Sequence, residues 1–140
     1  FFYDGGKNVR PSKDYFQNYL NGVLNKLSEF DTVDLILLQE VDSNAKRTYY
    51  TNQVDLIKQF TPIYSCVFAK NYDVGFIPQP LFSPVGSITS GMMLFSFYKP
   101  VEAIRYGFSV NYSLPKRIFF PDRCFIFSRY IKRTLKSNII

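Results

Sequence analysis

A short apolar run, Val33 to Leu38, constrains the fold of this chain more than any other feature. Five of its six positions are apolar, and the run stops at the polar pair Gln39 and Glu40. Because the apolar residues are successive rather than alternate, the pattern is typical of a central strand covered on both faces. We therefore predict a buried strand that ends at Leu38, with Glu40 two residues beyond it.

The segments around this run predict helices and a second strand. Residues 12–30 and 50–60 each repeat apolar side chains every three or four positions, which is the pattern of a helix with one buried face. Residues 63–69 are continuously apolar or aromatic apart from one Ser, and predict a strand. The order helix, strand, helix, strand indicates an α/β architecture.

The second half of the chain predicts antiparallel sheet after a long loop. Residues 71–90 contain three prolines and two glycines without any period, which predicts a surface loop. Residues 91–98, 101–108 and 123–131 predict strands, and Pro100 indicates a tight connection between the first two. The fold class expected overall is α/β (α+β) in a single domain, residues 1–140.

Composition narrows the possible functions. The chain has no histidine, which removes the Ser-His and Cys-His nucleophile systems and most zinc sites. Its net charge of +6 favours anionic partners, although a solvated basic surface would give the same value.

Cys66 and Cys124 form no metal pattern and are expected to be free thiols, with a disulfide between them left open. No apolar run is long enough to span a membrane and no signal peptide is visible, so the chain is expected to be soluble, in an unknown compartment.

Two segments in this order resemble the endonuclease/exonuclease/phosphatase superfamily of DNase-like, metal-dependent phosphoesterases. "VDLILLQEVD" is similar to the strand of that family that ends in Leu-Gln-Glu, and "SGMMLFSFYKP" keeps the Gly, a Ser and the Pro of a later family strand. The resemblance implies part of a four-layer α/β/β/α sandwich with mixed, largely antiparallel sheets. It also implies that Glu40 binds a catalytic Mg²⁺ (or Mn²⁺) and that Gln39 helps to fix the adjacent loop.

The resemblance further implies a function and its missing parts. The expected substrate is a phosphate ester, such as nucleic acid, a phospholipid headgroup or an inositol phosphate, and no obligate protein partner is implied. The family's metal-site Asn strand and its "T-H", "G-D-x-N" and "S-D-H" elements do not occur in this sequence. We therefore expect an incomplete piece of a larger catalytic domain that is inactive alone.

Three other residues are candidates for contacting the substrate, each with a structural alternative. Arg123 precedes a predicted strand and would bind phosphate, or else pair with Asp122 or Glu102. Asn71 opens the predicted loop and would contact the substrate, or else form a turn. Arg47 would be presented near Glu40, or else cover the following helix.

Two functions of another kind remain open. The chain would be a non-catalytic basic and aromatic module that binds nucleic acid, or a degenerate scaffold member of the family. The first requires Phe and Tyr side chains exposed in line with Lys and Arg. The helix and strand patterns instead predict that most Phe side chains lie in the core.

Overall fold

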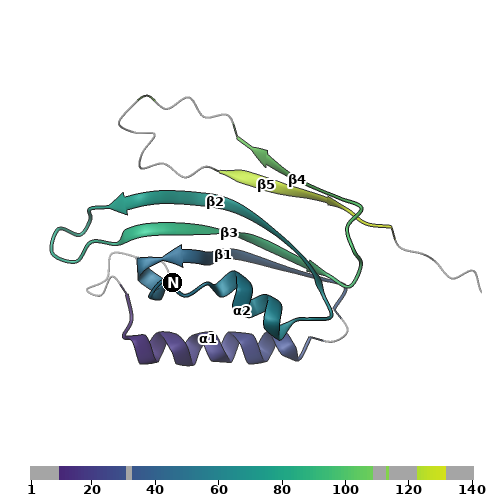
Figure 1. Ribbon diagram of the computed structural model, residues 1–140, viewed down its shortest axis with the longest axis horizontal. Helices are drawn as coiled ribbons and strands as arrows, with labels where there is room; N and C mark the ends of the chain where they lie inside the picture. Colours follow the sequence, from purple (N-terminus) through teal and green to yellow (C-terminus); the bar gives the residue numbers. More distant parts are fainter. Residues whose placement is uncertain (1–9, 31–32, 109–112, 114–122, 132–140) are drawn as a thin grey trace, which may run out of the picture.

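Two helices pack against one face of a three-stranded antiparallel sheet in the computed structural model, which describes residues 10–30, 33–108, 113 and 123–131 (Figure 1). The elements of this unit follow the chain in the order α1 (Lys13–Ser28), β1 (Leu35–Ala45), the 3₁₀ turn η1 (Lys46–Thr48), α2 (Gln53–Phe60), β2 (Ser65–Ile77) and β3 (Gly86–Ser96). A two-stranded ribbon follows, made of β4 (Glu102–Gly107) and β5 (Cys124–Arg129). The fold class is therefore α+β, with antiparallel pairing throughout the described strands.

Both helices begin at side-chain caps. The Ser12 hydroxyl accepts a hydrogen bond from the Tyr15 amide at the start of α1, and the Asn52 side chain accepts one from the Asp55 amide at the start of α2. Leu24 and Leu27 of α1 and Ile57 of α2 are buried in the main core. This core also contains inward-facing side chains of β1 and β3, so the sheet and both helices share it.

The sheet has the order β1–β3–β2, with β3 in the centre. Leu35 of β1 and Ser65 of β2 both lie opposite Ser96 of β3, which fixes the register at one end. At the other end, Ala45 and Val74 both lie opposite Ile88 of β3. The two outer strands thus flank the central strand along most of its length.

The prediction that the first strand is buried on both faces and ends at Leu38 was wrong. Side chains of β1 alternate: Ile36 is buried, whereas Leu35 is 49% and Leu37 74% exposed. The helices cover only one face of the sheet, and β1 lies at its edge. The strand also continues to Ala45 because β3 pairs with its polar second half.

The prediction of a loop over residues 71–90 was also wrong. Most of this segment belongs to β2 and β3, and only residues 78–85 connect the two strands. The three prolines lie within this connection, where they remove no hydrogen bond from the ladder. The strand predicted to begin at residue 91 therefore begins at Gly86.

The β4–β5 ribbon lies beside the outer edge of β2 (Figure 1). The carbonyl of Lys70 in β2 accepts a hydrogen bond from Nε of Arg105 at 2.8 Å and one from the thiol of Cys124 at 3.5 Å. These contacts join the ribbon to the sheet. Both strands of the ribbon confirm the sequence prediction, and both cysteines are free thiols, also as expected.

Within the described part of the chain, no helix is both long and apolar enough to cross a membrane.

Candidate functional site

Glu40 lies inside β1 rather than beyond its end, in an irregularity of the strand. The register between β1 and β3 shifts between Leu38 and Val41, which makes Gln39 and Glu40 the residues of a β-bulge. Glu40 has a φ of 60°, in the left-handed region that residues other than glycine rarely adopt. A bulge redirects a side chain that a regular strand would hold in the alternating pattern, and here it leaves the Glu40 side chain exposed.

The exposed Glu40 borders a pocket between α1 and β1. The pocket has a volume of about 210 Å³. Its walls combine side chains from α1, β1 and α2: Phe16, Tyr19, Leu20, Val23, Leu38, Gln39, Glu40, Val41, Gln53 and Ile57. The Glu40 carboxylate has no hydrogen bond or ion pair with any other residue that the structure describes, so its oxygens are available to an external ligand.

A second bulge lies at the same level of the sheet, in β2. The register between β2 and β3 shifts between Lys70 and Tyr72, which places Asn71 in the bulge. Both bulges lie within two positions of Gly91, which pairs with Val41 of β1 and with Lys70 of β2. Because β3 separates the two outer strands, Glu40 and Asn71 lie two strand spacings apart, roughly 10 Å.

The close packing at Gly91 excludes any side chain there. A Cβ on Gly91 would lie 2.3 Å from the carbonyl oxygen of Ala69 and 2.6 Å from the ring of Phe68. The first contact cannot be relieved without moving the β2 backbone, and the second requires the Phe68 ring to move. Gly91 therefore lets β2 approach the central strand beside the two bulges.

Arg123 lies at the same side of the sheet as Asn71. It directly precedes Cys124, whose thiol contacts the carbonyl of Lys70, the residue before Asn71. The Arg123 side chain is exposed, and its carbonyl accepts a hydrogen bond from the Phe108 amide at 2.8 Å. Pairing with Glu102 is excluded because Glu102 lies at the opposite end of the ribbon, where it pairs with Arg129 at 3.3 Å. Asp122, the other expected partner, lies outside the described residues.

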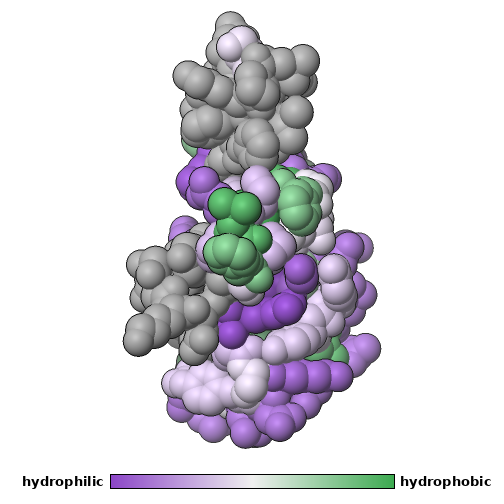
Figure 2. Space-filling model, turned by 90° about the vertical axis from the view of Figure 1, so that its left-hand side faces the viewer, coloured by the Kyte–Doolittle hydropathy of each residue, from purple (hydrophilic) through white to green (hydrophobic). Residues whose placement is uncertain are grey.

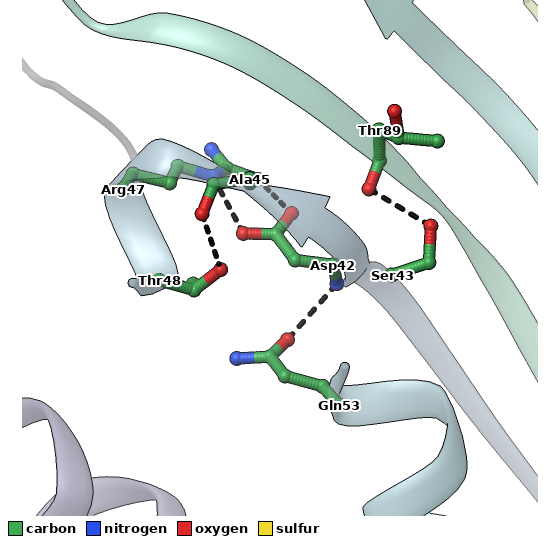
Figure 3. A network of polar contacts seen from close by, with 7 residues as sticks. All are labelled: Asp42, Ser43, Ala45, Arg47, Thr48, Gln53 and Thr89. Carbon is green, nitrogen blue, oxygen red and sulfur yellow. Dashed lines mark hydrogen bonds and ion pairs between the residues drawn. The ribbon is translucent and has the colours of Figure 1, made fainter. Parts of the chain in front are cut away.

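Arg47 is buried and anchors the end of β1 (Figure 3). Its Nε lies 2.9 Å from Oδ2 of Asp42 and its Nη2 lies 2.8 Å from Oδ1, so the guanidinium binds both carboxylate oxygens. Asp42 is 1% exposed, and its amide donates to Oε1 of Gln53 at 2.9 Å. Substrate contact by Arg47 stays a prediction, and its burial favours the alternative, a structural role beside the following helix.

Two residues that the sequence analysis assigned no role belong to this region. Asp42 follows Glu40 by two positions but is neutralised by Arg47 instead of facing solvent. Arg105 bonds the Lys70 carbonyl at the β2 bulge. The interior glycine of β3, Gly91, is the one sequence signal that could have indicated an irregular strand here, since glycine within a strand often marks a bulge or a close approach.

Two of the four predicted site residues, Glu40 and Asn71, therefore lie at the same level of the sheet, and the backbone of Arg123 follows beside Asn71 at the start of β5. Within residues 10–30, 33–108, 113 and 123–131, no three Asp, Glu, Cys or His side chains gather into a ready metal cluster. Glu40 could serve as a single protein ligand for a hard cation such as Mg²⁺, which commonly takes one or two carboxylates and fills its other positions with water and phosphate oxygens.

Comparisons of this chain with protein-family models, with curated proteins and with solved structures find no significant match.

Proposed function

We propose that this chain carries part of the catalytic site of a Mg²⁺- or Mn²⁺-dependent phosphoesterase of the endonuclease/exonuclease/phosphatase type. The observation that supports this most is Glu40, an exposed carboxylate without a partner among the described residues, on a bulge that fixes its backbone in an unfavourable conformation. Strained residues cluster at functional sites because the surrounding structure must maintain them. The resemblance of the Leu-Gln-Glu segment to a metal-binding strand points to the same residue.

The residues of this chain fit a partial metal site. A bound divalent cation would polarise a phosphoryl oxygen and neutralise the charge that develops on it. Glu40 would hold the cation, while the Asp42–Arg47 pair keeps the backbone two residues further on in place. Arg123 and Asn71 would bind the phosphate oxygens of an extended substrate across the sheet from Glu40. Because the chain contains no histidine, we assign proton transfer to groups that this sequence does not include.

The open face of the sheet supports the four-layer arrangement that the resemblance implies. Leu35 and Leu37 are exposed on the face that the helices leave uncovered. A second sheet packed at about 10 Å over this face would bury both side chains. The described part of the chain would then be the first α and β layers of an α/β/β/α sandwich.

The proposal is tested by Glu40→Gln, which keeps the shape of the side chain and removes its charge. In the protein as its gene encodes it, Mg²⁺-dependent hydrolysis of a phosphodiester should fall by on the order of a hundredfold or more, because a metal ligand is lost. Titration with Mn²⁺, followed by the electron paramagnetic resonance of free Mn²⁺, should show weaker binding by the variant. Glu29→Gln is the matched control, since Glu29 is an exposed carboxylate that pairs with Lys26 at the far end of α1. Equal turnover and equal Mn²⁺ binding by Glu40→Gln and the wild type would remove Glu40 from the site.

A second candidate function is the binding of single-stranded nucleic acid by the β4–β5 ribbon. The prediction that most Phe side chains lie in the core was wrong, because seven of the eleven Phe side chains that the structure describes are exposed, among them Phe108, Phe125 and Phe127 in or directly beside this ribbon. The rings of Tyr106 and Phe125 stack with centroids 5.0 Å apart, and such rings are platforms for bases. In β5, Phe125 and Phe127 alternate with less exposed residues, and Tyr106 of β4 lies directly opposite Phe125, so these rings share one face of the ribbon.

A salt titration separates the two functions. We would measure the binding of a labelled oligonucleotide. A steep loss of affinity with salt, no effect of a chelator, and loss of binding in Phe125→Ser would favour the binding module. Loss of binding on addition of a chelator, with restoration by Mg²⁺, would favour the phosphoesterase.

A further inference from the structure

The connection between β2 and β3 presents two apolar side chains to solvent. Leu81 is 88% exposed, and Phe82 is fully exposed. Figure 2 shows hydrophobic side chains gathered at the end of the molecule where Figure 1 draws this connection. We call residues 78–85 the hairpin tip.

Two backbone hydrogen bonds hold the hairpin tip in a defined turn. The Ser83 amide donates to the Pro80 carbonyl at 3.1 Å, and the Val85 amide donates to the Gln79 carbonyl at 3.0 Å. Val85, Ile88 and Ala45 form a small buried cluster beneath the tip. The fold therefore holds Leu81 and Phe82 outward, although burial of such side chains is normally favourable.

Charge is distributed unevenly around the hairpin tip. The sequence contains no charged residue from Val74 to Tyr98, so the tip and the adjoining strand ends are neutral. Lys46 lies at the base of the tip, where its Nζ is 3.5 Å from the Pro84 carbonyl oxygen. Arg10 lies beside Lys46, and its Nη1 is 3.4 Å from the Lys46 carbonyl oxygen. The nearest acid on β2, Asp73, is already paired with Lys70.

We propose that the hairpin tip inserts Leu81 and Phe82 into the surface of an anionic lipid bilayer, with Lys46 and Arg10 against the headgroups. A protruding apolar tip without charge can enter the interface, while cations behind it gain from the negative surface potential. A protein partner fits less well, because a stable interface buries roughly 800 Å² on each side and two projecting side chains supply far less. This inference is independent of the proposed phosphoesterase function.

The chain contains no tryptophan, which allows a direct test with one fluorophore. In Phe82→Trp, the emission should shift to shorter wavelength when vesicles of phosphatidylcholine and phosphatidylserine are added. Brominated acyl chains in these vesicles should then quench it. Ile63→Trp is the matched control, since Ile63 is 57% exposed just before β2, at the end of that strand opposite to the tip, and its emission should not respond.

Vesicle flotation gives a second measurement with unlabelled protein. The double variant Leu81→Ser and Phe82→Ser should bind these vesicles on the order of tenfold more weakly than the wild type, because the apolar groups that enter the lipid are lost. Ile63→Ser should bind like the wild type, and circular dichroism should show that both variants fold. Lys46→Gln should reduce binding to vesicles that contain phosphatidylserine and leave any binding to pure phosphatidylcholine unchanged.

Three results would overturn the inference. The first is emission from Phe82→Trp that is the same with and without vesicles. The second is equal flotation of the serine double variant and the wild type. The third is self-association of the wild type in sedimentation experiments that the serine double variant abolishes, together with no vesicle binding. This result would assign the tip to contact between copies of the chain.

Discussion

Glu40 combines an unfavourable backbone conformation with an available carboxylate. A left-handed conformation costs a non-glycine residue on the order of 1 kcal/mol because Cβ crowds the following carbonyl. Tyr49 and Tyr50, directly after η1, also have positive φ values, of 54° and 58°. The three residues flank the buried Asp42–Arg47 pair in the sequence, so the strain is concentrated between the bulge of β1 and the start of α2.

Replacement of Glu40 by glycine should stabilise the protein. Glu40→Gly should raise the free energy of unfolding by about 1 kcal/mol, because glycine adopts the left-handed region without the Cβ clash. Urea denaturation measures this change. Tyr50→Gly serves as a control for the same backbone effect outside the candidate site. A Glu40→Gly variant less stable than the wild type would show that the Glu40 side chain, and not its backbone, dominates the energetics.

Removal of Arg47 should be far more damaging than removal of an exposed arginine. Arg47→Ala should lower the free energy of unfolding by about 3–5 kcal/mol, because the buried carboxylate of Asp42 would lose the charge that compensates it. Arg129→Ala is the control, since Arg129 pairs with Glu102 at the surface and should change the stability by less than about 1 kcal/mol. Thermal unfolding of the two variants compares the effects. Combining Asp42→Asn with Arg47→Ala should recover part of the loss.

The bulges of β1 and β2 form one irregular region of the sheet, because both lie next to Gly91 of the central strand. Gly91 brings the β2 backbone close to β3, and each outer strand takes up an additional residue beside it. The Lys70 carbonyl, directly before the β2 bulge, accepts hydrogen bonds from the ribbon side chains Arg105 and Cys124. The irregular part of the sheet therefore both exposes Glu40 and attaches the β4–β5 ribbon.

Gly91→Ala tests this arrangement at the level of the sheet. The added Cβ would meet the Ala69 carbonyl oxygen at 2.3 Å, so we expect a loss of about 2 kcal/mol or more in the free energy of unfolding. Gly75→Ala is the matched control within the same hairpin, because a Cβ there meets nothing within 4 Å. Chemical denaturation should find Gly75→Ala as stable as the wild type or slightly more stable. Equal stability of the two variants would contradict the close approach at Gly91.

Elements that follow from the local spacing of apolar residues could be predicted from the sequence. Elements that form only by pairing with a strand distant in the sequence could not. The helices follow from the spacing of side chains such as Leu24 and Ile57, and the β4–β5 strands from their apolar runs. Apart from Val41, the second half of β1 is polar from Gln39 to Asn44, and it forms a strand because β3 pairs with it. Likewise, Glu40 could be identified as a candidate from its sequence neighbours, but the bulge that exposes it depends on Gly91, more than fifty residues away.

At the scale of the whole molecule, the sheet is covered on one face only by the elements described. Its helix face holds the main core, whereas Leu35 and Leu37 face outward on the other side. The expectation of burial on both faces came from successive apolar residues, but the described structure exposes Leu35 and Leu37 and buries Ile36 between them. An apolar pattern shows that a side chain can be buried but does not show whether another element covers it, so the sequence could not distinguish a covered face from an open one.

The strand order β1–β3–β2 also implies an order of folding. Contacts between β2 and β3 join residues close in the chain, such as Val74 and Ile88, whereas contacts between β1 and β3 join distant ones, such as Leu35 and Ser96. Since closing a longer loop costs more conformational entropy, the hairpin should form first and β1 should dock later. In pulsed hydrogen exchange during refolding, amides of β2 and β3 should become protected before those of β1. Simultaneous protection would indicate a single nucleus that already includes β1, and the bulge that carries Glu40 would then form in the first step of folding instead of the last.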